Sequence, residues 1–104
     1  MEKIAFKMKL KPGYKEEYIK RHNAIWPELK ELLIKSGISD YTIFLDEETN
    51  ILFAVQKQHG TASSQDLGSL PIVHSWWKFM EDIMVTNPDS SPVSIPLEKV
   101  FHMD

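Results

Sequence analysis

The chain has 104 residues, no cysteine and a formal net charge of −3. This length suits one hydrophobic core, and we expect a single domain over residues 1–104. Lysine and glutamate are interspersed without a basic stripe, which argues against a nucleic-acid partner. The lack of cysteine excludes disulfides and thiolate metal sites, and no apolar run approaches the roughly 20 residues that cross a bilayer. We therefore expect a cytoplasmic protein that does not contact membranes.

The first strand and the first helix follow from side-chain periodicity. Apolar and polar residues alternate over residues 4–10, which predicts a strand with one buried face. A Pro-Gly pair at residues 12–13 ends this pattern. Apolar side chains then recur at helical spacing over residues 14–36, and Gly37 is a natural end for that helix.

A proline interrupts the predicted helix. Pro27 has no N–H to donate, and it disfavours helical geometry at Trp26. We expect the helix to kink there, or to break and restart, just after His22 and Asn23. Either outcome frees backbone groups close to the imidazole.

The second half of the chain begins with a predicted antiparallel hairpin. Two β-rich runs, residues 41–45 and 51–56, are separated by the polar turn 46–50. Residues 57–70, which contain glycine, serine and threonine, are expected to form a mobile loop with a weak helical turn.

A second helix and a final strand complete the prediction. Apolar side chains repeat at helical spacing from Pro71 to Met84, and Ser69 is the expected N-cap. Residues 87–92 form a turn-rich connector, and residues 97–103 are expected to be the last strand.

This order of elements predicts an α+β, ferredoxin-like βαββαβ fold, with two helices on one face of a four-stranded antiparallel sheet. The opposite face of the sheet would carry Ala5, Lys7 and some residues of the hairpin. We expect that face to be solvated or to contact a second subunit. The fold hosts many functions, so the site must indicate the activity.

Tyr18 and His22 are the first candidate site residues. They are four positions apart, so a helix places them on one face, and Trp26 and Leu29 continue the same stripe. A histidine on an apolar face often packs against a core. The alternative is an imidazole and a phenol that face a pocket.

Two further clusters favour a pocket. Trp76 and Trp77 are adjacent and project about 100° apart on a helix, so they cannot share one environment. Tyr41 can face the interior from the beginning of a strand, and its phenol then needs a hydrogen-bond partner.

Several motifs follow one another in a specific order. They are Tyr18, Arg21-His22-Asn23, Ile25-Trp26-Pro27-Glu28-Leu29, Tyr41, Leu45-Asp46, Trp76-Trp77-Lys78, Asn87-Pro88-Asp89 and Ser91-Pro92-Val93. Together they closely resemble the L-rhamnose mutarotase family, small aldose anomerases, over nearly the whole chain. The resemblance is weakest over residues 57–75, where we expect relatives to carry an aromatic residue near the position of Ser64.

The resemblance implies a homodimer of ferredoxin-like subunits, of the dimeric α/β barrel type, that interconverts the α and β anomers of L-rhamnose. It implies His22 as the proton donor. It also implies that four side chains contact the sugar, namely Tyr18, Tyr41, Trp76 and Trp77.

The chemistry of mutarotation suits these residue types. A proton leaves the anomeric hydroxyl while another reaches the ring oxygen, and imidazole, with an ordinary pKa of about 6.5, can serve as both base and acid. No cofactor is required. The second proton-transfer group is left open between a tyrosine, Asp89 and a bound water.

Three alternatives compete with this interpretation. A metal site is disfavoured because the four histidines, at positions 22, 59, 74 and 102, show no ligand spacing. The same dimeric fold could instead carry a cofactor-free monooxygenase or a non-catalytic binding module.

Overall fold

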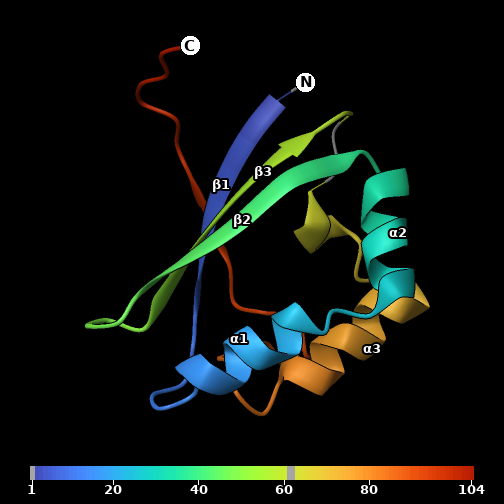
Figure 1. Ribbon diagram of the computed structural model, residues 1–104, viewed down its shortest axis with the longest axis vertical. Helices are drawn as coiled ribbons and strands as arrows, with labels where there is room; N and C mark the ends of the chain where they lie inside the picture. The colour runs from blue at the N-terminus through green and yellow to red at the C-terminus, as the bar shows by residue number, and fades with distance from the viewer. Residues whose placement is uncertain (1, 61–62) are drawn as a thin grey trace.

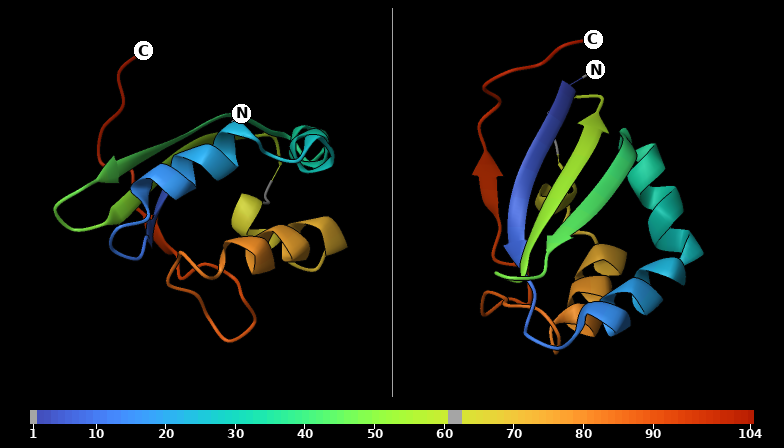
Figure 2. Two further views of the ribbon diagram at one scale, coloured as in Figure 1. Left: turned by 60° about the horizontal axis from the view of Figure 1, so that its bottom comes forward. Right: turned by 60° about the vertical axis from the view of Figure 1, so that its left-hand side comes forward.

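The computed structural model of the chain describes residues 2–60 and 63–104 and contains a sheet with helices on one face (Figures 1 and 2). The elements in chain order are β1 (Glu2–Lys9), α1 (Lys15–Asn23), α2 (Pro27–Lys35), β2 (Ile38–Asp46), β3 (Ile51–Gln58), the 3₁₀ turn η1 (Ser64–Asp66), α3 (Pro71–Met80) and β4 (Ile95–Leu97). The four strands are antiparallel in the order β2-β3-β1-β4. This is the ferredoxin-like order, so the predicted α+β fold is confirmed.

The first predicted helix is two helices. α1 ends at Asn23 and α2 begins at Pro27, so the chain breaks and restarts. Trp26 has the extended geometry expected before proline (φ −60°, ψ 126°), and Pro27 occupies the first turn of α2, where no N–H is needed. Gly37 follows α2 with φ +88°, and a Cβ there would lie 2.6 Å from the His59 carbonyl oxygen, so only glycine fits.

The start of α3 was predicted correctly, but its cap was not. The helix begins at Pro71, and its N-cap is Leu70, which makes no side-chain capping bond. Ser69 is therefore not the cap. Proline in the first turn removes one of the N–H groups that lack a partner within the helix, so fewer of them need a cap.

The end of α3 was predicted too late. The helix ends at Met80, not at Met84. Beyond it, the Lys11 N–H donates to the Ile83 carbonyl (2.9 Å), and Met84 forms an isolated antiparallel bridge with Leu10. Ile83 and Met84 are still buried, so the apolar spacing continues although the chain has left the helix to pair with the end of β1.

The last strand was also misplaced. β4 spans Ile95–Leu97 and pairs with Ala5 to Lys7 at the sheet edge, where Pro96 is tolerated. Residues 98–104 have no regular secondary structure. The strand predicted over residues 97–103 is therefore wrong beyond Leu97, and Val100 is 90% exposed.

The segment predicted as a loop, residues 57–70, contains more order than expected. Lys57 and Gln58 belong to β3, and the weak helical turn is η1. The Ser63 side chain caps η1 by accepting from the Gln65 N–H (3.1 Å). The prediction for residues 61–62 lies outside the described residues.

The core lies between the inner face of the sheet and the helices. β1 and β3 contribute alternate residues, as their pleat requires. The buried cluster consists of Phe6, Met8, Leu10, Tyr18, Leu29, Leu52, Ala54, Val73, Trp76, Trp77, Met80, Ile83 and Met84. Within the described residues, no helix covers the outer sheet face, as the right-hand view of Figure 2 shows.

Candidate active site

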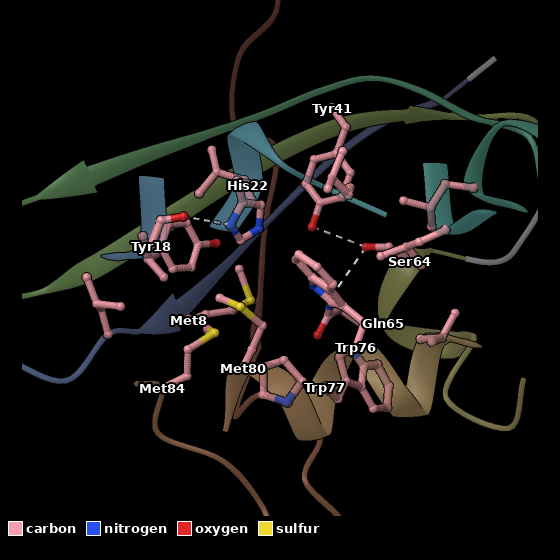
Figure 3. A pocket seen from close by; sticks show the side chains of 18 of the residues that line it. Met8, Tyr18, His22, Tyr41, Ser64, Gln65, Trp76, Trp77, Met80 and Met84 are labelled. Atoms are coloured by element: carbon pink, nitrogen blue, oxygen red, sulfur yellow. Dashed lines mark hydrogen bonds between the residues drawn. The ribbon is translucent and has the colours of Figure 1, made fainter. Parts of the chain in front are cut away.

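A cavity of about 970 Å³ lies between the inner sheet face and the helices (Figure 3). Side chains from β1, β2, β3, α1, α2, η1 and α3 line it. All five predicted site residues are among them: Tyr18, His22, Tyr41, Trp76 and Trp77. The structure therefore brings together residues that lie up to 59 positions apart in the sequence.

The first wall of the cavity, here called the helical wall, consists of Tyr18, His22 and Trp76. Tyr18 and His22 lie one turn apart on α1 with their rings stacked, 4.1 Å between centroids and 24° between planes. His22 meets Trp76 of α3 edge-on at 5.5 Å. The shared helix face that the i, i+4 spacing predicted is therefore present.

A backbone hydrogen bond sets the tautomer of His22. Its Nδ1 lies 3.1 Å from the Tyr18 carbonyl oxygen. A carbonyl can only accept, so Nδ1 carries the proton and Nε2 has a free lone pair. In Figure 3 the ring nitrogen that does not bond to Tyr18 lies on the cavity side.

Burial sets the protonation states of both groups. It lowers the pKa of His22 below 6.5, against a smaller opposing effect of the hydrogen bond to Tyr18, so the imidazole is neutral at pH 7. Burial raises the pKa of Tyr18 far above 10, so its hydroxyl keeps its proton. The helical wall thus presents an unprotonated base beside a protonated hydroxyl.

The two tryptophans are equally buried, at 8% exposure each, but have different neighbours. Trp76 contacts His22 and packs edge-on against Trp26 at 5.1 Å. Trp77 lies against Gly68, where a Cβ would come within 2.2 Å of its Cζ3 atom. They share one cavity, contrary to the expectation of separate environments, and differ in what they pack against.

An arginine ties the two helices of this wall together. The Arg21 guanidinium binds both carboxylate oxygens of Asp82 (2.8 and 3.1 Å) and donates to the Phe79 carbonyl (2.8 Å). It also lies over the Phe79 ring, 4.7 Å from the centroid. The ion pair lowers the pKa of Asp82. Because Arg21 precedes His22 on α1, this contact fixes the imidazole relative to α3.

The second wall, here called the polar wall, consists of Tyr41 and Ser64, which line the cavity, together with the buried Gln56 that binds Ser64. Tyr41 lies in β2 at a bulge, where Asp40 and Tyr41 together lie opposite Gln56 of β3. Asp40 has φ +47°. Tyr41 alternates with Ile43 and Leu45 and therefore lies on the inner face. The Ser64 hydroxyl lies 3.4 Å from the Tyr41 hydroxyl and supplies the partner that this phenol was expected to need.

Sequence reasoning missed Ser64, Gln65 and Gln56. Ser64 and Gln65 line the cavity from η1, in the segment predicted as a loop. A signal for Gln56 was available, because the inward positions of β3 run Leu52, Ala54, Gln56 and Gln58. An amide on a core-facing position needs a buried partner, which points to a polar group nearby.

Asp89, one candidate for the second proton-transfer group, does not line the cavity. Its side chain is exposed and accepts hydrogen bonds from the Ser91 hydroxyl and N–H, which lower the pKa of the carboxyl. An exposed carboxylate of this kind is a poor proton donor at neutral pH.

Across residues 2–60 and 63–104, no group of three or more His, Cys, Asp and Glu side chains is placed to hold a metal ion. Within the same residues, no helix is long and apolar enough to span a bilayer.

Fold and site together define a class: a ferredoxin-like α+β protein whose pocket combines a neutral imidazole, tyrosine hydroxyls and indole rings, a site suited to acid–base chemistry on a small polar molecule. The comparisons give the particular family. The family model of L-rhamnose mutarotase matches residues 3–103. The chain belongs to this family.

Individual relatives agree with the family assignment. The chain is 66% identical to an L-rhamnose mutarotase of Bacteroides thetaiotaomicron and 62% identical to one of Phocaeicola vulgatus, each over 100% of both chains. A crystal structure of an L-rhamnose mutarotase from Formosa agariphila matches with a TM-score of 0.93 and 58% identity, covering 100% of both chains.

Proposed function

We propose that this chain is an isomerase that interconverts the α and β anomers of L-rhamnose. The observation that carries the proposal is the neutral His22, whose free Nε2 faces a cavity large enough for a sugar, between phenol hydroxyls and indole rings. Membership of the L-rhamnose mutarotase family supports the choice of sugar. The monooxygenase and the non-catalytic binding module gain no such support.

Ring opening begins with His22 as the base. Its Nε2 takes the proton of the anomeric hydroxyl, the C1–O1 bond becomes a carbonyl, and the electrons of the C1–ring-oxygen bond move to the ring oxygen. The ring oxygen takes up a proton, so atoms and charge balance and the product is the open-chain aldehyde. Rotation about the C1–C2 bond and closure by the reverse steps give the other anomer.

The same imidazole can supply the second proton. The hydroxyl oxygen and the ring oxygen are bonded to the same carbon, so an imidazolium formed at one lies close to the other. His22 is then a donor, as the family resemblance implies, but only after it has acted as a base. Tyr18 and Tyr41 stay protonated because burial raises both pKa values, so they stabilise oxygen charge as hydrogen-bond donors.

The remaining lining residues hold the sugar. Trp76 and Trp77 offer flat apolar surface to the C–H face of the ring. Met80 and Met84 add adaptable apolar surface on the same side of the cavity, suited to a 6-methyl group.

The decisive experiment is NMR saturation transfer between the two anomeric protons of L-rhamnose, with and without protein. Faster exchange with unchanged substrate mass is the expected result. Exchange at the spontaneous rate would indicate a binding module, and consumption of dioxygen would indicate an oxygenase.

We also propose a homodimer that forms through the outer sheet face and acts in the cytoplasm. Phe44 of β2 is 61% exposed on this face, and Ile95 and Leu97 of β4 are exposed at the opposite edge of the sheet. Such an apolar surface is typical of an interface. Light scattering should give twice the mass of one chain, and Phe44→Glu should shift the population toward monomer. A wild-type monomer at micromolar concentration would contradict the proposal.

A further inference from the structure

The polar wall starts from a buried amide. The Gln56 side chain is fully buried on the inner face of β3. Both of its polar atoms bind one residue: Oε1 accepts from the Ser64 backbone N–H (3.0 Å), and Nε2 donates to the Ser64 hydroxyl (2.9 Å). A backbone N–H can only donate, so the amide orientation is determined. Gln56 therefore holds Ser64 in one place and one orientation.

The bonds to Ser64 also determine where its hydroxyl proton points. Its oxygen accepts from Gln56 and, at 3.4 Å, from the Gln65 side chain, so both lone pairs are used. Its single hydrogen is then directed to the remaining partner, the Tyr41 hydroxyl oxygen at 3.4 Å. Figure 3 shows Ser64 between Tyr41 and Gln65 at the edge of the cavity.

These hydrogen bonds leave the hydroxyl proton of Tyr41 unused. The Tyr41 oxygen accepts a hydrogen bond from Ser64, so the O–H of Tyr41 is not used in the series Gln56–Ser64–Tyr41. That O–H can therefore donate into the cavity. Burial raises the pKa of Tyr41, which keeps that proton in place at neutral pH. The bulge in β2 and the turn η1 meet here, which brings together residues from three separate segments.

We propose that Ser64, locked by Gln56, is a positioning residue that presents the Tyr41 hydroxyl to the sugar as a hydrogen-bond donor. The inference rests on the proposed function, because it assumes that Tyr41 contacts the substrate. It adds the direction of that contact: the sugar must offer an acceptor oxygen to the polar wall. It also assigns a role to two residues, Gln56 and Ser64, outside the predicted site.

The test is Ser64→Ala, which removes the hydroxyl and keeps the backbone bond to Gln56. One lost neutral hydrogen bond should raise KM for L-rhamnose about 3- to 10-fold and leave kcat within about twofold. Ser64→Thr restores the hydroxyl and should restore KM. The matched control is Ser69→Ala, an exposed serine of the same segment, which should behave like wild type.

Tyr41→Phe separates two hypotheses: that Ser64 positions the Tyr41 hydroxyl, and that Tyr41 contacts the sugar. The series of hydrogen bonds Gln56–Ser64–Tyr41 is here called the relay. If the relay positions the phenol, Tyr41→Phe raises KM at least as much as Ser64→Ala does, and adding Ser64→Ala to Tyr41→Phe has no further effect. A wild-type KM in Ser64→Ala, with a raised KM in Tyr41→Phe, would overturn the relay alone. A wild-type KM in both variants would overturn the Tyr41 contact in the proposed function as well.

A second measurement needs no sugar. In protein labelled with ¹³C-tyrosine, the Cζ resonance of Tyr41, assigned by its loss in Tyr41→Phe, reports the hydrogen bonding of the phenol. It should shift in Ser64→Ala and return in Ser64→Thr, whereas the resonances of Tyr14 and Tyr18 stay in place. A Tyr41 resonance that does not shift in Ser64→Ala would contradict the relay, and this result does not depend on whether the protein acts on L-rhamnose.

Discussion

The helical wall and the polar wall of the cavity are built in different ways. On the helical wall, Tyr18 and His22 come from one stretch of α1, and their stacking follows from a spacing of four residues. On the polar wall, Tyr41, Ser64 and Gln56 come from three segments and meet only through a strand bulge and a buried amide.

This difference in construction matches a difference in role: His22 on the helical wall carries out proton transfer, whereas the polar wall binds the sugar. The base sits on a helix that Arg21 ties to the end of α3, so its position depends on few contacts that are local or strong. The polar wall depends on long-range contacts around η1, which spans only three residues. We therefore expect changes to the α1 residues of the helical wall, Tyr18 and His22, to lower the rate of exchange, and changes on the polar wall to alter affinity.

The largest effect should come from His22→Asn, which removes the base from the helical wall. Anomeric exchange should fall by at least about 10²-fold, because one positioned acid–base group typically contributes about 10²- to 10⁴-fold. Saturation transfer measures the exchange, and circular dichroism should show a retained fold. Tyr18→Phe is the companion variant and should cost less, since its hydroxyl only donates. A folded His22→Asn protein with the wild-type rate would leave this histidine a packing residue.

A large effect on stability should come from Gly68→Ala. The added methyl group would lie 2.2 Å from Trp77 Cζ3, so either the indole or the backbone must move. Such overpacking costs about 1–3 kcal/mol of unfolding free energy. Chemical denaturation measures this, with Ser69→Ala as the control in the same segment. Unchanged stability would mean that the indole can move aside without cost.

The variants Trp76→Phe and Trp77→Phe should have different effects, one on substrate affinity and the other on stability. Trp77 packs against Gly68, so its replacement should mainly lower the melting temperature. Trp76 lies beside His22, so its replacement should mainly raise KM, by about 3- to 10-fold if one stacking contact worth about 1 kcal/mol is lost. Two variants that lose only stability would assign both rings to the core.

The smallest effect should be the dependence of stability on pH. Burial lowers the pKa of folded His22 below its unfolded value of 6.5, so below pH 6.5 the unfolded chain binds a proton that the folded chain does not. The unfolding free energy should therefore fall as the pH falls from 6.5 through the lower folded pKa. Above pH 6.5 this group has no effect. Denaturation curves of wild type minus His22→Asn isolate the contribution, and a difference independent of pH would contradict it.

Sequence patterns sufficed where structure is local. Alternation over residues 4–10 identified β1, and Pro27 with Trp26 identified the break between α1 and α2, because both depend on backbone sterics and side-chain period. Patterns failed where a partner elsewhere decides the conformation. Met84 continues the helical spacing of α3 but pairs with Leu10. Val100 belongs to a segment of strand-like composition, but its side chain is exposed.

The sequence by itself determined the order of the elements and the pairing of Tyr18 with His22 on the helical wall, because a spacing of four residues places them side by side in any α-helix. Only the tertiary structure decided the polar wall. Alternation with Ile43 and Leu45 turns Tyr41 inward, but the partners that decide whether its hydroxyl donates, Ser64 and Gln56, come from other segments. Hydrogen-bond direction is a property of the whole network, so no single stretch of the chain specifies it.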